Sequence, residues 1–232
     1  MIKSLIFSLL FVFVTLSGNA QSDCSVFFPF RKGAVMEYTS YDRKGKVENI
    51  TENKVISVMK SSDGSVEAEL ATIVRNKKGK EEFSGAYEVS CQDGILQIDV
   101  TSMLNPGMLQ SFQGMEISID GDYVTLPNEL EEGSVLTEAT TKISAGTNGI
   151  SIINMTINIK DRKVDGIERV TTPAGTFDCY KLLQTTEVNM MITKSFDSIE
   201  YYAEGVGIVR SETLDDDGEV IAYMELTAFE KP

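Results

Sequence analysis

The sequence predicts an all-β protein, an antiparallel meander that forms either a sandwich or an open half barrel with one short helix. Apolar and polar residues alternate with period two along several stretches, as in strands with one buried and one solvated face. Some of these stretches are separated by predicted turns with the same residue pattern, Asp or Asn at the first position and Gly at the fourth. Many short strands at close spacing are typical of sandwiches and barrels.

The first twenty residues have the pattern of a secretory signal peptide. Lys3 gives a positive start, residues 5–16 form an almost unbroken apolar run, and Gly18-Asn19-Ala20 offers the small residues that a signal peptidase reads. The run is too short for a membrane span, which disfavours a retained anchor, and no later segment is apolar enough to span. We therefore expect cleavage after Ala20, export to the periplasm or the exterior, and one mature domain of residues 21–232.

The composition limits the chemistry. The 232 residues include 21 Lys and Arg, 35 Asp and Glu, no His and no Trp, with a formal net charge of −14. Without His, neither a Ser-His-Asp nor a Cys-His device can form, nor a zinc site with an imidazole ligand. The negative charge argues against nucleic acid as a partner, because phosphate binding needs a cationic surface. We expect no cofactor.

Three cysteines enter an oxidising compartment if the chain is exported. Cys24 lies in a short N-terminal arm, and Cys91 ends a predicted strand whose apolar face also contains Tyr87 and Val89. We favour a Cys24–Cys91 disulfide, which ties the arm to the sheet and leaves Cys179 as a small buried hydrophobic residue. The other two pairings and three reduced thiols remain open, because sequence alone does not settle connectivity.

The clearest alternation lies in residues 66–74, 153–160 and 220–228, which we expect to be half-buried antiparallel strands. Matching turns lie at residues 42–46, 76–80 and 215–219. The last of these contains three successive Asp residues before Gly218. A calcium loop of the EF-hand type would place its bidentate carboxylate at Met224, so a hairpin turn is the better interpretation.

Residues 105–114 break the alternation and predict a short helix. Asn105 can cap it, Pro106 suits the first helical position, and Gly114 can end it. Its apolar face comprises Met108, Leu109 and Phe112. The simpler interpretation is a plug on one open end of the sheet, and the alternative is a lid over an apolar cavity.

A faint internal similarity divides the mature chain. Pro29 precedes Lys32-Gly33-Ala34-Val35-Met36, and Pro127 precedes Glu132-Gly133-Ser134-Val135-Leu136. Each segment opens a β-rich half. We treat the mature chain as one domain, with a possible internal joint at residues 127–133.

Ser198 is a candidate modification site. Asp197-Ser198-Ile199 resembles the Asp-Ser/Thr-aliphatic acceptor for O-glycosylation of exported Bacteroidota proteins. Such a modification requires an accessible surface position.

Three segments resemble a known family. They are residues 24–38 (CSVFFPFRKGAVMEY), 170–181 (VTTPAGTFDCYK) and 201–212 (YYAEGVGIVRSE). Together they are similar to an uncharacterised family of exported Bacteroidota proteins, labelled TapB-like or as a domain of unknown function. The resemblance covers most of the mature chain. It implies a β-rich exported domain with no assigned activity, so no catalytic residue is transferred to this sequence.

Three functions remain open because no site is visible in the sequence. The favoured one is a non-catalytic cell-envelope protein, an interaction or scaffold domain that binds an unknown protein partner. The alternative is a carrier or binder of an apolar, lipid-like ligand in an open barrel, suggested by the Met- and Ile-rich strands. A carboxylate-based hydrolase is the weaker alternative, suggested only by the number of acidic residues. A ligand-sized cavity with polar groups would favour the carrier, and two close buried carboxylates would favour the hydrolase.

Overall fold

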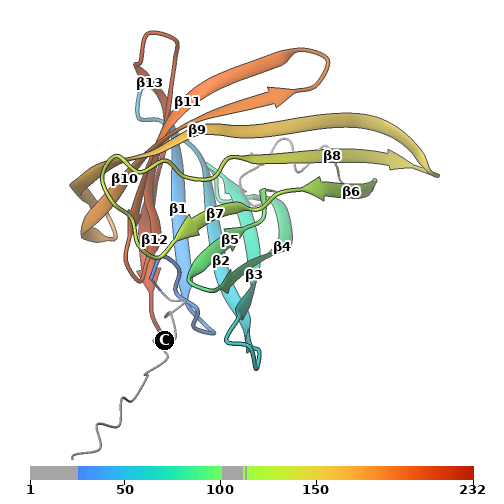
Figure 1. The fold of residues 1–232 in the computed structure, drawn as a ribbon. Coiled ribbons are helices and arrows are strands. Elements are labelled where there is room, and N and C mark those ends of the chain that lie inside the picture. Colours follow the sequence, from blue (N-terminus) through green and yellow to red (C-terminus); the bar gives the residue numbers. More distant parts are fainter. Residues whose placement is uncertain (1–25, 101–111, 113) are drawn as a thin grey trace, which may run out of the picture.

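The computed structural model describes residues 26–100, 112 and 114–232 (Figure 1). In this part, the chain forms thirteen strands and no helix. The strands are β1 (Val35–Asp42), β2 (Val47–Lys60), β3 (Val66–Asn76), β4 (Glu81–Gln92), β5 (Ile95–Ile98), β6 (Glu116–Gly121), β7 (Val124–Pro127), β8 (Ala139–Thr147), β9 (Ile150–Thr172), β10 (Gly175–Asn189), β11 (Thr193–Ala203), β12 (Gly207–Leu214) and β13 (Val220–Glu230).

All thirteen strands belong to one sheet, in the order β6-β8-β9-β10-β11-β12-β13-β1-β2-β3-β4-β5-β7. Runs β1–β5 and β8–β13 are meanders, and β1 pairs with β13 to join them, with Val35 opposite Glu230. The sheet curls into an open half barrel (Figure 1). The all-β antiparallel prediction is confirmed. Of the two expected architectures the open barrel is correct, since a sandwich requires two stacked sheets.

Strands β6 and β7 are neighbours in sequence but lie at opposite edges of the sheet. β6 pairs with β8, β7 pairs with β5, and only Asp122 and Tyr123 lie between them. Because extended chain spans only about 3.5 Å per residue, the two edges come close together here. The Asp122 amide donates to the Thr140 carbonyl at 2.9 Å, and the Asp122 carbonyl accepts from the Thr141 hydroxyl, also at 2.9 Å. The crossover is thus anchored on β8.

The three matched turns form as the sequence predicts. Asp42 Oδ1 accepts the amides two and four residues further along the chain, both at 2.9 Å, and Gly45 has a φ of 71°. The side chains of Asn76 and Asp215 accept the equivalent amides of their own turns. Each glycine takes the left-handed conformation that L-residues adopt at a cost. The Asp215 loop is therefore a hairpin turn.

Two hydrophobic clusters lie inside the half barrel. The larger lies around the β1–β13 junction and includes the fully buried Val55, Leu70 and Leu226. The smaller lies on the inner face of β8 and β9 and includes Ile143 and Met155. The inward side chains come from alternate strand positions, as the period-two patterns predict.

Several predicted features fall outside the described residues. These features are the signal peptide, Cys24, Met108, Leu109 and most of the predicted helix. The described part of the chain contains no helix with the length and hydrophobicity to cross a membrane. Residues 127–133 run from the end of β7 into the irregular segment before β8, and their role as a joint stays a prediction.

Candidate ligand-binding site

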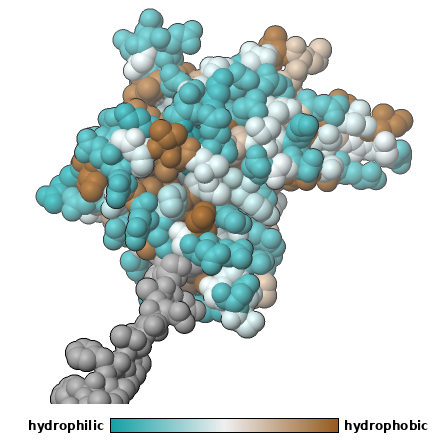
Figure 2. All heavy atoms as spheres, viewed as in Figure 1, coloured by the Kyte–Doolittle hydropathy of each residue, from teal (hydrophilic) through white to brown (hydrophobic). Residues whose placement is uncertain are grey.

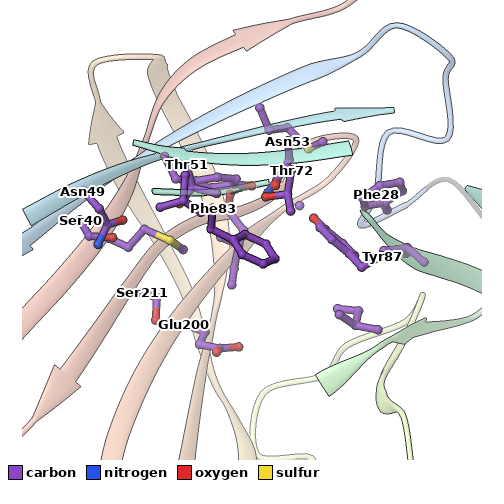
Figure 3. Close-up of a pocket in the computed structure, with 18 of the residues that line it drawn as sticks. Phe28, Ser40, Asn49, Thr51, Asn53, Thr72, Phe83, Tyr87, Glu200 and Ser211 are labelled. Atoms are coloured by element: carbon purple, nitrogen blue, oxygen red, sulfur yellow. Dashed lines mark hydrogen bonds between the residues drawn. The ribbon is translucent and has the colours of Figure 1, made fainter. Parts of the chain in front are cut away.

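A cavity of about 790 Å³ lies between the two hydrophobic clusters (Figure 3). Side chains from β1–β6, β8 and β11–β13 line it. Small-molecule sites typically have volumes of about 300–1,000 Å³, so the cavity has the size of a ligand site. Glu48 and Ile117 are exposed and belong to the lining, so the cavity opens to solvent.

Most of the lining is apolar or aromatic. One wall is made by strands β6 and β8 with the segment that precedes β6, and its side chains are Phe112, Ile117, Ile119 and Ile143. Aromatic side chains of β1, β4 and the N-terminal segment make much of the remainder, namely Phe27, Phe28, Tyr38, Tyr41, Phe83 and Tyr87. Such walls suit an apolar ligand, because burying apolar surface is favourable by about 25 cal/mol per Å².

Uncharged polar side chains form a strip on a different wall. Asn49, Thr51 and Asn53 line the cavity from alternate positions of β2. Thr72 of β3 is opposite Asn53 in the strand register, and Ser40 of β1 is opposite Asn49. Figure 3 shows Asn53 beside Thr72 and Asn49 beside Ser40. We call these five residues the polar strip.

The polar strip ends where the interior becomes fully packed. On β2, the next inward residue after Asn53 is Val55, which is 0% exposed. Asn53 therefore marks the inner end of the strip and Asn49 its outer end, near the exposed Glu48. Asn53 Oδ1 is buried and has no hydrogen-bond partner among the described residues.

A second polar group, Glu200 of β11, lines the cavity apart from the polar strip (Figure 3). Its Oε1 accepts from Gln184 Nε2 at 3.0 Å, and its Oε2 accepts from the Tyr202 hydroxyl at 3.0 Å. Gln184 Oε1 in turn accepts from Arg162 Nε at 3.3 Å. These four side chains are each at most 4% exposed. They form one buried network across β9, β10 and β11, which we call the Arg162–Tyr202 network.

Burial controls the protonation of this network. It raises the pKa of Glu200, although the Tyr202 hydrogen bond and the Arg162 charge act in the opposite direction. It also raises the pKa of Tyr202 far above its usual value, with a further contribution from the nearby Glu200 charge. Burial lowers the pKa of Arg162, but a guanidinium stays protonated at any ordinary pH. Arg162 is therefore the cation that compensates Glu200.

The described lining of the cavity carries no positive charge. Its lining, as far as the structure describes it, includes no Lys or Arg, and its acidic members are Glu48 and Glu200. Burial raises the pKa of Tyr38 and of Tyr87, so both phenols stay neutral. The Tyr38 hydroxyl also donates to the Ile208 carbonyl at 3.2 Å. The site is thus apolar with uncharged polar groups, a poor match for an anionic head group.

The predicted lid residues are placed only in part. Phe112 is 4% exposed, packs in the smaller cluster and lines the cavity. Met108 and Leu109 lie outside the described residues, so the helix and its role as plug or lid stay predictions.

Cys91 and Cys179 lie outside the described cavity lining. Cys91 is disulfide-bonded, whereas Cys179 is a free thiol with 0% exposure. Burial raises the pKa of Cys179 to about 12, and the nearby Asp178 and Glu168 charges add to the shift. The predicted partner of Cys91, Cys24, lies outside the described residues, so the pairing stays a prediction.

Ser198, the predicted glycosylation site, is half-buried in β11. It lies between Gln184 of β10 and Thr213 of β12 in the sheet register, and its hydroxyl is 3.5 Å from the Gln184 carbonyl. Its modification stays a prediction.

The described residues offer little to the hydrolase hypothesis. Glu200 is the one buried acidic side chain among them, and the other acidic lining residue, Glu48, is exposed. In the same part of the chain, no group of three or more His, Cys, Asp or Glu side chains could hold a metal ion. The paired carboxylates that glycosidase chemistry needs are not assembled in the described cavity.

Sequence reasoning missed the polar strip and Glu200. A signal for the strip existed in β2, where Asn49, Thr51, Asn53 and Val55 share one face and only the last is apolar. Glu200 sits in the otherwise apolar run Ile199-Glu200-Tyr201-Tyr202-Ala203. Neither pattern shows which face points inward until the strand pairings are known.

Residues 31–226 match the model of the DUF3108-like family, a domain of unknown function. Because this match covers most of the sequence, the chain belongs to the DUF3108-like family. The finding confirms the resemblance to an uncharacterised family of exported proteins that the sequence indicates. A search of curated proteins finds no match.

Two solved structures share the fold. One is a Bacteroides fragilis protein that is predicted to be exported and described as having a YmcC-like fold, with 24% identity and a TM-score of 0.76. The other is a predicted lipoprotein of Parabacteroides distasonis, with 27% identity and a TM-score of 0.75. Each comparison covers 90% of this chain and 100% of the other chain.

Proposed function

We propose that this exported protein binds an apolar or lipid-like ligand inside its half barrel. The main support is the cavity of about 790 Å³ that lies between the two hydrophobic clusters and opens to solvent. Contiguous apolar surface that stays open to solvent is uncommon in monomeric proteins and often marks a ligand-binding groove. A cavity of this volume with mostly apolar walls therefore favours a binding site.

The site also has the composition of an amphiphile site. Apolar walls with a few polar groups at fixed places are typical of small-molecule pockets, where the polar groups orient the ligand. Here the polar strip runs from the inner end of the cavity to its mouth, and Ile117 and Ile119 offer an apolar wall. A ligand with an apolar body and a small polar end matches both.

A native mass spectrum of the protein purified from a secretory host tests the proposal. We expect a stoichiometric adduct of lipid-like mass that leaves on gentle collisional activation. Ser211→Trp places an indole in the cavity, where Ser211 is part of the lining, and should abolish the adduct. Ser84→Trp is the matched control, because Ser84 is exposed on β4 and outside the lining. A bare wild-type mass, or an adduct that survives in Ser211→Trp, contradicts the proposal.

Binding of a protein partner is the second candidate function, favoured by exposed apolar side chains at the ends of two hairpins. Met191 and Ile192, in the β10–β11 turn, are 100% and 71% exposed, and Ile150, at the start of β9, is 70% exposed. Figure 2 shows hydrophobic atoms at the end of the projecting β8–β9 hairpin. Exposed apolar groups that cluster on a surface mark interaction sites.

Site-specific crosslinking tests this second function. A photoreactive residue in place of Met191 should give one dominant crosslinked species in the native host. The same residue in place of Lys77, in the polar β3–β4 turn, should give none. Equal crosslinking at both positions would reflect collision rather than binding and would count against a partner at the hairpin ends.

A further inference from the structure

We infer that Asn53 binds the polar end of the ligand, and that this end is an uncharged group with a hydrogen-bond donor, a hydroxyl or an amide N–H. This inference rests on the proposed function and specifies its ligand. The key observation is that Asn53 Oδ1 is buried, belongs to a cavity-lining side chain and has no hydrogen-bond partner among the described residues.

An unpaired buried amide oxygen is unusual. Nearly all buried polar atoms in native proteins have at least one partner, and leaving one unpaired costs about 1–3 kcal/mol. Asn53 Oδ1 is the one buried side-chain nitrogen or oxygen without a partner in the part of the chain that the structure describes. Because Oδ1 is covered in the ligand-free protein, a donor in the cavity reaches it when the Asn53 amide turns about its Cβ–Cγ bond. The hydrogen bond formed in this way removes the cost, so the ligand-free protein is the state that bears it.

The position of Asn53 determines which end of the ligand it meets. It lies at the inner end of the polar strip, beside Met36 and Thr72 in the strand register and one inward position from the fully packed Val55. Thr72 is 9% exposed and adds a hydroxyl beside the amide. Figure 3 shows both side chains at the same wall of the cavity. The polar end therefore binds deep in the cavity, and the apolar body extends towards Phe112 and Ile117.

The charge of the described lining argues against anionic head groups. A phosphate, sulfate or carboxylate would need a cation or several N–H donors, but no Lys or Arg lies in the described lining. The acidic members of the described lining, Glu48 and Glu200, also disfavour an anion. A neutral hydroxyl or amide can donate to Asn53 Oδ1 without the desolvation that an ion would need.

Three ligands with one alkyl chain and different ends separate the possibilities. Monolauroylglycerol has hydroxyl donors, methyl laurate has none, and laurate is an anion. Their binding can be compared by displacement of the apolar dye phenylnaphthylamine from the purified protein, below the concentrations at which micelles form. We expect monolauroylglycerol to bind about tenfold more tightly than methyl laurate, which is the worth of one buried hydrogen bond. Laurate should bind most weakly of the three.

Asn53→Leu tests the residue itself, because leucine has nearly the shape of asparagine without its polar atoms. The variant should bind both esters with affinities within about twofold of each other, since the discriminating bond is gone. Its ligand-free unfolding temperature should equal or exceed that of the wild type, because an unpaired buried amide has been removed. Asn158→Leu is the matched control. Asn158 lies outside the lining and bonds Thr140 and Glu187, so this change should lower stability and leave the ester preference intact.

The outcomes distinguish this inference from the proposed function. If wild-type protein binds both esters equally, or prefers laurate, the assignment of Asn53 and of an uncharged donor is wrong while apolar binding stands. If neither ester displaces the dye, both the inference and the proposed function are wrong. A loss of stability in Asn53→Leu as large as that in Asn158→Leu would show that Asn53 serves the fold, and would also overturn the inference.

Discussion

Arg162 of β9 donates from Nη1 to the backbone carbonyl of Thr125 of β7, at 2.9 Å. These strands are far apart in the order of the sheet, since β7 is one edge strand and β9 is third from the other edge. The same Nη1 donates to the Thr137 carbonyl at 2.6 Å. One buried guanidinium thus bridges the two margins of the half barrel, and through Gln184 it connects this closure to Glu200 at the cavity.

Arg162→Met should strongly destabilise the protein. The change keeps the apolar stem but leaves Glu200 as a buried charge without its cation and two carbonyls without their donor. Removing one partner of a buried pair costs about 3–5 kcal/mol, so the midpoint of urea unfolding should fall clearly. Arg169→Met is the control, because the Arg169–Asp178 pair is exposed, with side chains 72% and 65% accessible. Equal midpoints for the two variants would rule out a closing role for Arg162.

Glu200 should make the protein more stable as the pH falls. Burial raises the pKa of Glu200 in the folded state above its ordinary value of 4.5. At a pH between the pKa of Glu200 in the unfolded state and its raised pKa in the folded state, the folded protein binds a proton that the unfolded chain has lost. The free energy of unfolding therefore decreases as the pH rises through this window. Above the raised pKa the whole cost of the buried carboxylate is present.

Glu200→Gln removes this contribution and isolates it from other groups. Lowered pKa values of Asp42, Asp63 and Glu187 give the opposite slope, because each carboxylate accepts hydrogen bonds in the folded state. We therefore expect the difference in the free energy of unfolding between wild type and Glu200→Gln to change with pH above about 4.5. As the pH rises, the variant should become more stable relative to the wild type. A difference that is constant from pH about 4.5 to 8 would show that Glu200 has an ordinary pKa.

Gly121 makes the crossover from β6 to β7 possible. Its φ is +147°, and a Cβ there would lie 2.2 Å from the Thr140 carbonyl oxygen, a contact with backbone that cannot be relieved by a side-chain rotation. Gly121→Ala should lower the free energy of unfolding by about 2 kcal/mol or more, since strain of this kind costs 1–3 kcal/mol per residue. At Gly149, φ is +74° and an added Cβ would have no atom within 4 Å. Gly149→Ala should therefore lower the free energy of unfolding only by the cost of a left-handed alanine, about 1 kcal/mol. Similar losses in urea melts of the two variants would contradict the role of the close approach.

The local elements of the fold could be predicted because their signals are local. Inward residues of β3 alternate from Val66 to Val74 and all are buried, as the pattern in residues 66–74 predicts. The stripe in residues 220–228 holds from Ala222 to Leu226, although Ala222 and Met224 are only half-buried. It fails at its end, because a β-bulge places Phe229 rather than Ala228 opposite the buried Met36. The half-burial of Ala222 and Met224 has a simple cause. The reason is that they face the cavity rather than a packed neighbour.

The closure of the barrel and the site depend on non-local pairing. Nothing near β6 in the sequence shows that it leaves its neighbour β7 and pairs with β8. The inward direction of Asn53 follows from the pairing of β2 with β1 and β3, because a shift by one residue would turn the side chain to solvent. In a sequence such an Asn is indistinguishable from a solvated polar residue.

Cys179 should be inert in the native protein and react only on unfolding. Its thiol is free and fully buried, and burial raises its pKa to about 12, so almost no thiolate is present or accessible at neutral pH. A chromogenic disulfide reagent should detect no thiol in the native mature protein. It should detect one per chain in denaturant, because Cys91 is disulfide-bonded, and all three of the cysteines after reduction. Peptide mapping of the unreduced protein should then find Cys91 joined to Cys24. A Cys179 peptide in that bridge would contradict both the pairing and the assignment of Cys179 as a buried hydrophobic residue. Three thiols per chain in denaturant without reductant would contradict the pairing.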